Sequence, residues 1–176
     1  MKRITLALPA PYVGLRPFTE KETLLFFGRD AHVRELLTKL EARQRFTAVL
    51  GASGTGKSSL VRAGLVPALH RGALASAGYS WNVCIFKPGD APLSSLAHAL
   101  TEDERWIDNE ERATSISSLS SLLSVSELAL SNLYEQKSAA FGSQALLLVV
   151  DQFEEIFRYR QAAIERILLA AKPRNH

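Results

Sequence analysis

The stretch GASGTGKSS, residues 51–59, decides the fold. It matches the pattern G-x-x-x-x-G-K-[ST], with Gly51, Gly56, Lys57 and Ser58 at the fixed positions. Glycines let the backbone wrap closely around phosphate oxygens, and the helix expected to follow presents free N–H groups to an anion. The alternative is a glycine-rich turn that matches the pattern by chance. The flanking residues favour a phosphate-binding loop, because they predict the strand and the helix that such a loop requires.

These flanking elements are read from composition and periodicity. Phe46–Leu50 (FTAVL) is short, apolar and rich in β-forming residues, so it predicts a buried strand leading into the loop. A helix is expected from about residue 56 to residue 69, with Gly72 beyond its end. Pro67 lacks an N–H group and is expected to bend or end the last turn of that helix.

The loop predicts the ligands of a nucleoside triphosphate, and ATP with Mg²⁺ is the expected pair. Lys57 is expected to reach the β- and γ-phosphates, Ser58 to offer its hydroxyl to Mg²⁺, and Ser59 to help at the α-phosphate. No guanine-reading N/T-K-x-D stretch is present, which favours ATP over GTP. The candidate ligands within the loop are Gly51, Ser53, Gly54, Thr55, Gly56, Lys57, Ser58 and Ser59.

A second apolar strand ends in an acidic residue. Ala145–Val150 predicts a strand, and Asp151 at its carboxyl end is the candidate Mg²⁺ residue. Glu154 and Glu155 follow as candidate catalytic bases for an attacking water, with Glu155 preferred. The alternative is that Asp151 caps the next helix and the two glutamates occupy its favourable first turn.

The rest of the chain alternates between strand and helix patterns. Trp81–Lys87 predicts a strand, and helical patterns cover residues 91–138 and 153–171. Near the N-terminus, Thr19 with Glu22 predicts a capping box for a short helix through about Phe26. Asp30 is expected to cap a second helix. Apolar strands alternating with helices predict an α/β fold with a parallel sheet covered on both faces.

The composition is that of one globular domain. The chain has 176 residues, of which 47% are hydrophobic and 22% charged, and its net charge is +3. The basic residues form no run, so a nucleic-acid surface is not implied.

Two features of the sequence indicate where the protein is located. Cys84, the one cysteine, lies in an apolar stretch and is expected to be a small buried hydrophobe in a reducing compartment. Pro9 and Pro11 interrupt the N-terminal apolar run, so no secretion signal is predicted and the expected location is cytoplasmic.

Three segments together resemble a known family. They are YVGLRPFTEKETLLFFGRD (12–30), FTAVLGASGTGKSSLVRAGLVPAL (46–69) and LLLVVDQFEEIF (146–157), and they resemble the STAND class of signal-transduction NTPases. The subgroup that they match is called novel STAND NTPase 1, which occurs in bacterial multidomain proteins. The resemblance implies the ATP-binding part of a nucleotide-gated switch, in a defence or regulatory protein. It also implies partner sensor or effector domains, or self-association. Separately, the run at residues 145–150 is too short to cross a bilayer, so no membrane is expected as a partner.

The resemblance implies a division of the chain as well. Residues 1–45 are expected to fold over the nucleotide base and residues 46–176 to form the P-loop core. Phe27, Gly28 and Arg29 are then placed near the base or ribose, with Pro17 and Phe18 lining the same site. The alternatives stay open: Gly28 as a helix terminator, Arg29 as a surface charge, and Phe18 as a small core anchor.

The resemblance implies a three-layer α/β/α P-loop fold whose parallel sheet has five strands. A fourth strand would lie between the loop strand and the Asp151 strand, followed by a sensor arginine, and neither is recognisable here. The core is therefore expected to be incomplete and to bind nucleotide more readily than it hydrolyses it. The alternatives are a DNA-associated AAA-like ATPase, a small-molecule phosphotransferase, and an interaction module that nucleotide stabilises without turnover.

Overall fold

The structure is a computed structural model that describes residues 14–74, 80–102, 112–141 and 144–159. The chain divides into two compact units, Met1–Trp81 and Asn82–His176, called unit 1 and unit 2 below. The mixture of helices with a small parallel sheet is compatible with the predicted α/β class. The three-layer sheet and the division at residue 45 stay predictions.

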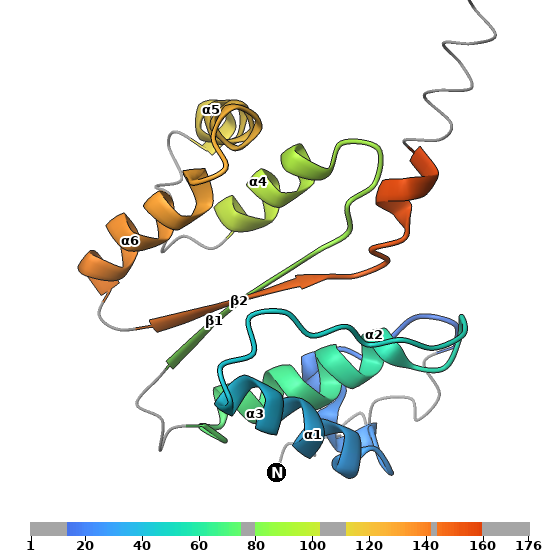
Figure 1. The fold of residues 1–176 in the computed structure, drawn as a ribbon. Helices are drawn as coiled ribbons and strands as arrows, with labels where there is room; N and C mark the ends of the chain where they lie inside the picture. The colour runs from blue at the N-terminus through green and yellow to red at the C-terminus, as the bar shows by residue number, and fades with distance from the viewer. Residues whose placement is uncertain (1–13, 75–79, 103–111, 142–143, 160–176) are drawn as a thin grey trace, which may run out of the picture. The chain divides into compact units, whose positions relative to one another are not determined.

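Unit 1 is helical in its described part (Figure 1). It begins with a 3₁₀ helix, η1 (Glu20–Leu25), and continues with α1 (Asp30–Glu41). After the glycine-rich loop comes one continuous helical run made of α2 (Lys57–Ser59), a π-helical segment η2 (Leu60–Leu65) and α3 (Val66–His70). The buried apolar residues of this run form the core of unit 1: Leu60, Ala63, Leu65, Val66, Ala68 and Leu69.

The predicted capping box at the start of η1 is confirmed. The Glu22 carboxylate accepts hydrogen bonds from the Thr19 N–H at 2.9 Å and from the Thr19 hydroxyl at 2.8 Å. The capping role predicted for Asp30 is wrong, because the N-cap of α1 is Arg29 and Asp30 is its first helical residue. Gly28 has a left-handed φ of +76°, so the chain turns just before Arg29. The helix can therefore begin at Asp30, with Arg29 as its N-cap. Asp30 instead places a negative charge in the first turn, where the helix dipole favours it.

The helix does not end at Pro67 but continues to His70, so of the two effects predicted for Pro67 the termination is wrong. Pro67 is the second residue of α3, directly after the π-helical segment ends. The hydrogen-bond register changes at this junction, so the absence of an N–H group at an N-terminal position is tolerated. Gly72 (φ +81°) follows the end of the helix, as predicted.

The strand predicted for Phe46–Leu50 is not formed in the structure. These residues have no regular secondary structure, and the sheet in the described part of the chain contains only two other strands. Phe46 is 79% exposed and Leu50 90% exposed, so the segment is not buried either. A strand exists only when a neighbouring strand pairs with its N–H and C=O groups, and none of the described residues does so here.

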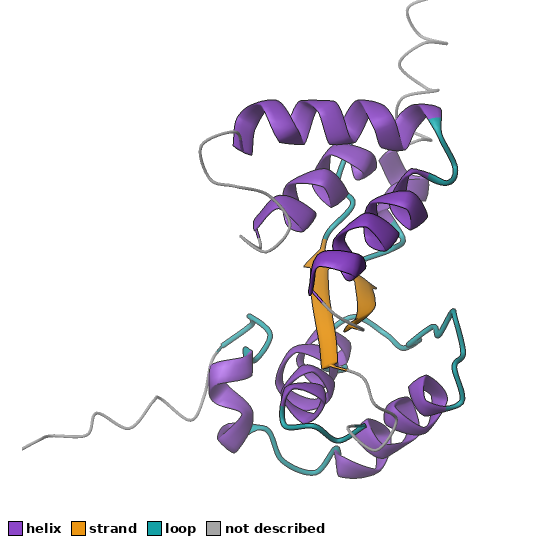
Figure 2. Ribbon diagram, turned by 90° about the vertical axis from the view of Figure 1, so that its left-hand side faces the viewer, coloured by secondary structure: helices purple, strands orange, loops and turns teal. Residues whose placement is uncertain are grey.

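The two remaining strand predictions are confirmed within one residue. Strands β1 (Ser80–Phe86) and β2 (Gln144–Val150) pair in parallel (Figures 1 and 2). The Asp151 N–H donates to the Phe86 carbonyl at 2.9 Å and extends this pairing beyond the end of β2. The carboxyl ends of both strands therefore lie side by side, which is where functional residues gather in parallel sheets.

Three helices pack on one face of the strand pair in unit 2. They are α4 (Pro92–Glu102), α5 (Arg112–Val125) and α6 (Ala129–Phe141), and they agree with the helical region predicted for 91–138 except that α6 extends three residues beyond it. Cys84, Ala97, Leu100 and Leu119 form the buried centre, which confirms Cys84 as a small buried hydrophobe. Of the helix predicted for 153–171, residues 155–159 are helical and the remainder lies outside the described residues. Among the described helices, none is long and apolar enough to cross a membrane.

Candidate functional site

The glycines of residues 51–56 have conformations that other residues rarely adopt. Gly54 (φ +78°) and Gly56 (φ +83°) lie in the left-handed region of backbone space. At Gly51 a side chain would start 3.0 Å from the Thr55 hydroxyl oxygen. The pattern therefore has its glycines where the backbone turns sharply and where it approaches itself closely, as predicted for a loop that encircles a ligand.

Lys57 is held inside this loop. Its ammonium group donates to the carbonyl oxygens of Gly51 at 2.7 Å and Ala52 at 2.9 Å. The Thr55 hydroxyl donates to the Ala52 carbonyl at 2.8 Å, which closes the turn from the other side. The loop is thus folded around a positive charge, and a phosphate group is the kind of anion that complements it.

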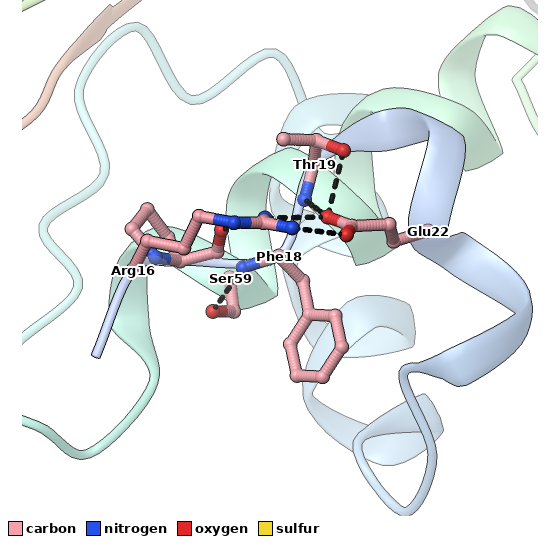
Figure 3. Close-up of polar contacts among 6 residues, drawn as sticks. Arg16, Phe18, Thr19, Glu22 and Ser59 are labelled. Atoms are coloured by element: carbon pink, nitrogen blue, oxygen red, sulfur yellow. Dashed lines mark hydrogen bonds and ion pairs between the residues drawn. The ribbon is translucent and has the colours of Figure 1, made fainter. Parts of the chain in front are cut away.

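Two serines follow Lys57 in the helical run. Ser58 is half-buried, whereas Ser59 is only 8% exposed. The Ser59 hydroxyl oxygen accepts a hydrogen bond from the Phe18 N–H at 3.0 Å (Figure 3). Sequence reasoning did not find this contact, which spans 41 positions. The predicted α-phosphate role of Ser59 stays a prediction, because a hydroxyl that accepts one bond still has a hydrogen to donate.

The residues before α1 also reach the loop. We call residues 14–29 the N-terminal arm. Arg29 donates from Nη2 to the Thr55 carbonyl at 3.1 Å, which brings together two candidate ligands 26 positions apart. Gly28 forms the adjacent turn, and Phe27 is 79% exposed. Phe18 packs against Phe26 with ring centroids 6.0 Å apart. This contact is of the kind expected if Phe18 is a small core anchor.

An ion pair organises the N-terminal arm internally (Figure 3). Arg16 donates from both terminal nitrogens to the two oxygens of Glu22, at 2.8 Å and 2.5 Å. The Glu22 side chain is 13% exposed, and these bonds, together with that from the Thr19 N–H, lower the pKa of Glu22 to about 2. Glu22 therefore stays ionised far below the ordinary pKa of a glutamate.

This shift predicts an acid-dependent weakening of the arm. Because the folded-state pKa of Glu22 is lowered, its contribution to stability is complete above its ordinary pKa of 4.5 and is lost as the pH falls towards 2. In Glu22→Gln the thermal midpoint is expected to lie below that of the wild type at pH 7 and to converge with it near pH 2, measured by circular dichroism. Glu35→Gln removes an exposed i,i+4 pair with Lys39 and should give a smaller difference. If the difference in thermal midpoint between Glu22→Gln and the wild type does not change with pH, the role of the ion pair is contradicted.

The acidic candidates lie in unit 2, at the end of β2. Asp151 is half-buried, and Gln152 directly after it has φ +61°, a left-handed conformation that is uncommon outside glycine. Glu155 accepts a hydrogen bond at Oε2 from the Gly89 N–H at 3.1 Å. Glu154 is exposed. The structure thus places the two glutamates differently: Glu155 is held by the backbone that follows β1, and Glu154 faces solvent.

The two residues predicted to hold a metal, Ser58 and Asp151, each offer an oxygen donor. Among the described residues, no three His, Cys, Asp or Glu side chains come together as a metal site. Mg²⁺ usually keeps several waters and takes one or two protein oxygens together with substrate phosphates. The Ser58 hydroxyl and the Asp151 carboxylate are oxygens of that kind, and their role as metal residues stays a prediction.

Comparison with known families agrees with these features. The sequence model of the family described as Novel STAND NTPase 1 matches residues 11–172. This range includes the glycine-rich loop, Asp151, the whole N-terminal arm and all of the described helices. No curated protein and no solved structure matches the chain. Because the family match spans most of its length, the chain belongs to the Novel STAND NTPase 1 family.

Proposed function

We propose that this chain binds ATP with Mg²⁺ and is the nucleotide-binding part of a STAND-type signalling switch. The observation that supports this most is the loop at 51–56, which is folded around the Lys57 ammonium and leads directly into a helical run. Such a loop offers a positive charge and backbone N–H groups to the same anion. Family membership supports nucleotide use in general.

Each candidate residue has a proposed role. Lys57 binds the β- and γ-phosphates, and Ser58 and Asp151 hold Mg²⁺, which supplies positive charge that neutralises the phosphates. The arm residues Phe27 and Arg29 contact the base or ribose. The hydrogen bond from the Arg29 guanidinium to the Thr55 carbonyl supports this role, because it brings Arg29 to the loop.

Hydrolysis depends on the two glutamates. Glu155 is the preferred base, and its bond from Gly89 fixes one of the two carboxylate oxygens. A carboxylate has several lone pairs. This bond therefore orients the Glu155 carboxylate and leaves other lone pairs that can accept a proton from water. Phosphate release that disappears in Glu155→Gln while binding remains would support turnover. Binding without release in the wild type would support a switch that nucleotide stabilises without being consumed.

Replacing the proposed metal residue gives a direct test. For Asp151→Asn, we expect the Mg²⁺-dependent part of the ATP affinity to fall roughly tenfold, because a neutral amide binds a hydrated divalent cation more weakly than a carboxylate. Affinity is measured by isothermal calorimetry with and without Mg²⁺. Asp90→Asn, an exposed aspartate in the same unit, is the matched control and should leave the affinity unchanged. Equal Mg²⁺ dependence in Asp151→Asn and wild type would remove Asp151 from the metal site.

A further inference from the structure

The hydroxyl of Ser59 contacts the N-terminal arm. It is buried in the helical run directly after Lys57 and Ser58, and its oxygen accepts the Phe18 N–H at 3.0 Å (Figure 3). Successive residues of a helix point about 100° apart around its axis. Ser58 and Ser59 therefore face different directions. When Ser58 faces the phosphates, the hydroxyl of Ser59 is on the side where the arm lies.

The part of the arm around Phe18 is internally braced. The Arg16–Glu22 ion pair and the two hydrogen bonds from Thr19 to Glu22 tie its backbone into one local structure. The Phe18 ring packs on Phe26 within the same segment. A braced segment moves as a unit, so the bond at the Phe18 N–H, together with the packing of Phe26 near Gly64, sets where the segment lies on the helical run.

The Phe26 ring of the arm packs near Gly64 of the helical run, and two further polar contacts join the arm to unit 1, both of them exposed. Glu20 contacts the His70 ring nitrogen at 2.6 Å, and Arg29 reaches the Thr55 carbonyl at 3.1 Å. Exposed polar pairs contribute little because water competes for both partners. The bond to Ser59 is partly buried and its acceptor is 8% exposed, so water competes less for it, and losing the acceptor leaves the Phe18 N–H without that partner.

We infer that Ser59 is a positioning residue for the N-terminal arm and not a ligand of the α-phosphate. By holding the Phe18 amide, its hydroxyl sets the arm so that Phe27 and Arg29 contact the base or ribose of a bound nucleotide. This inference rests on the proposed ATP binding and adds to it a physical link between the phosphate loop and the base-contacting segment. Affinity for the nucleoside part of ATP then depends on Ser59, whereas affinity for its phosphates does not.

Comparing ATP with inorganic triphosphate separates the two roles. Triphosphate with Mg²⁺ occupies the loop but offers nothing to the arm. For Ser59→Ala, calorimetry is expected to show roughly tenfold weaker ATP binding, the effect of one lost hydrogen bond, with triphosphate binding within about twofold of wild type. Equal weakening for both ligands would make Ser59 a phosphate ligand and overturn the inference. No change for either ligand would also overturn it.

The controls distinguish this inference from the proposed function. Ser59→Thr keeps the hydroxyl and should retain the wild-type ratio of ATP to triphosphate affinity, and Ser117→Ala on α5 should change neither. Glu22→Gln loosens the arm without touching the helical run, so it should give the same selective loss of ATP affinity even when Ser59→Ala folds poorly. Wild-type chain that binds neither ligand would contradict the proposed function itself. A different result would contradict only the positioning role: triphosphate binds and needs Lys57, but Ser59→Ala and Glu22→Gln both bind ATP as tightly as the wild type.

Discussion

Lys57→Ala is expected to weaken Mg²⁺–ATP binding roughly 30- to 150-fold, which corresponds to about 2–3 kcal/mol for hydrogen bonds from a charged donor to phosphate oxygens. The ammonium group of Lys57 lies within the loop and donates to two of its carbonyl oxygens. Phosphate oxygens are stronger acceptors than these carbonyls because they are charged. Nucleotide binding is therefore expected to draw the ammonium group from the carbonyls to the phosphates, and calorimetric titration of both proteins measures the difference.

The same substitution has a second consequence without nucleotide. Removing the ammonium group leaves the Gly51 and Ala52 carbonyls without this donor, so amide exchange across residues 53–56 should become faster. Lys39→Ala, which removes a half-buried lysine of α1 that is paired with Glu35, is the matched control and should affect neither measurement. An unchanged ATP affinity in folded Lys57→Ala would exclude the loop as the nucleotide site.

The strands and helices of unit 2 were predictable because their signals are local. The apolar runs at 80–86 and 144–150 each form a strand, and the leucine periodicity between them forms helices. The same reasoning failed at Phe46–Leu50, where composition favours a strand as strongly. A strand also needs a partner, and the partner is a property of the whole fold that composition does not contain.

The sharp turns at the glycines of the loop were predictable, but the attachment of the loop to the N-terminal arm was not. A fixed spacing of glycines and lysine indicates a phosphate-binding conformation, and the positive φ angles of Gly54 and Gly56 agree with it. The contacts of Phe18 with Ser59 and of Arg29 with Thr55 join residues 41 and 26 positions apart. Common residue types make these contacts, so no pattern marks them. The π-helical segment Leu60–Leu65 was missed because its sequence suits an α-helix equally well.

Gly64, within this π-helical segment, is the site where a small change should most reduce stability. A Cβ atom at Gly64 would lie 2.7 Å from Cγ2 of Val33 on α1 and 3.3 Å from Cε1 of Phe26 in the arm. Valine is stiff at χ1 and short, so its methyl group cannot swing away as the end of a long side chain would. The gain in helix propensity from Gly64→Ala, about 1 kcal/mol, offsets part of the overlap. Gly64→Val adds two further methyl groups and should cost about 3 kcal/mol.

Thermal unfolding of the two Gly64 variants tests this packing. A loss of about 3 kcal/mol in a unit of this size should lower the midpoint of Gly64→Val on the order of 10–20 °C, with a smaller shift for Gly64→Ala. A double-mutant cycle with Val33→Ala isolates the overlap, because that change removes the methyl group nearest to the new Cβ. The double variant should therefore be more stable than the sum of the two single changes predicts. Strict additivity would show that α1 does not pack against Gly64, and the close contact between α1 and the helical run after the phosphate loop would then be wrong.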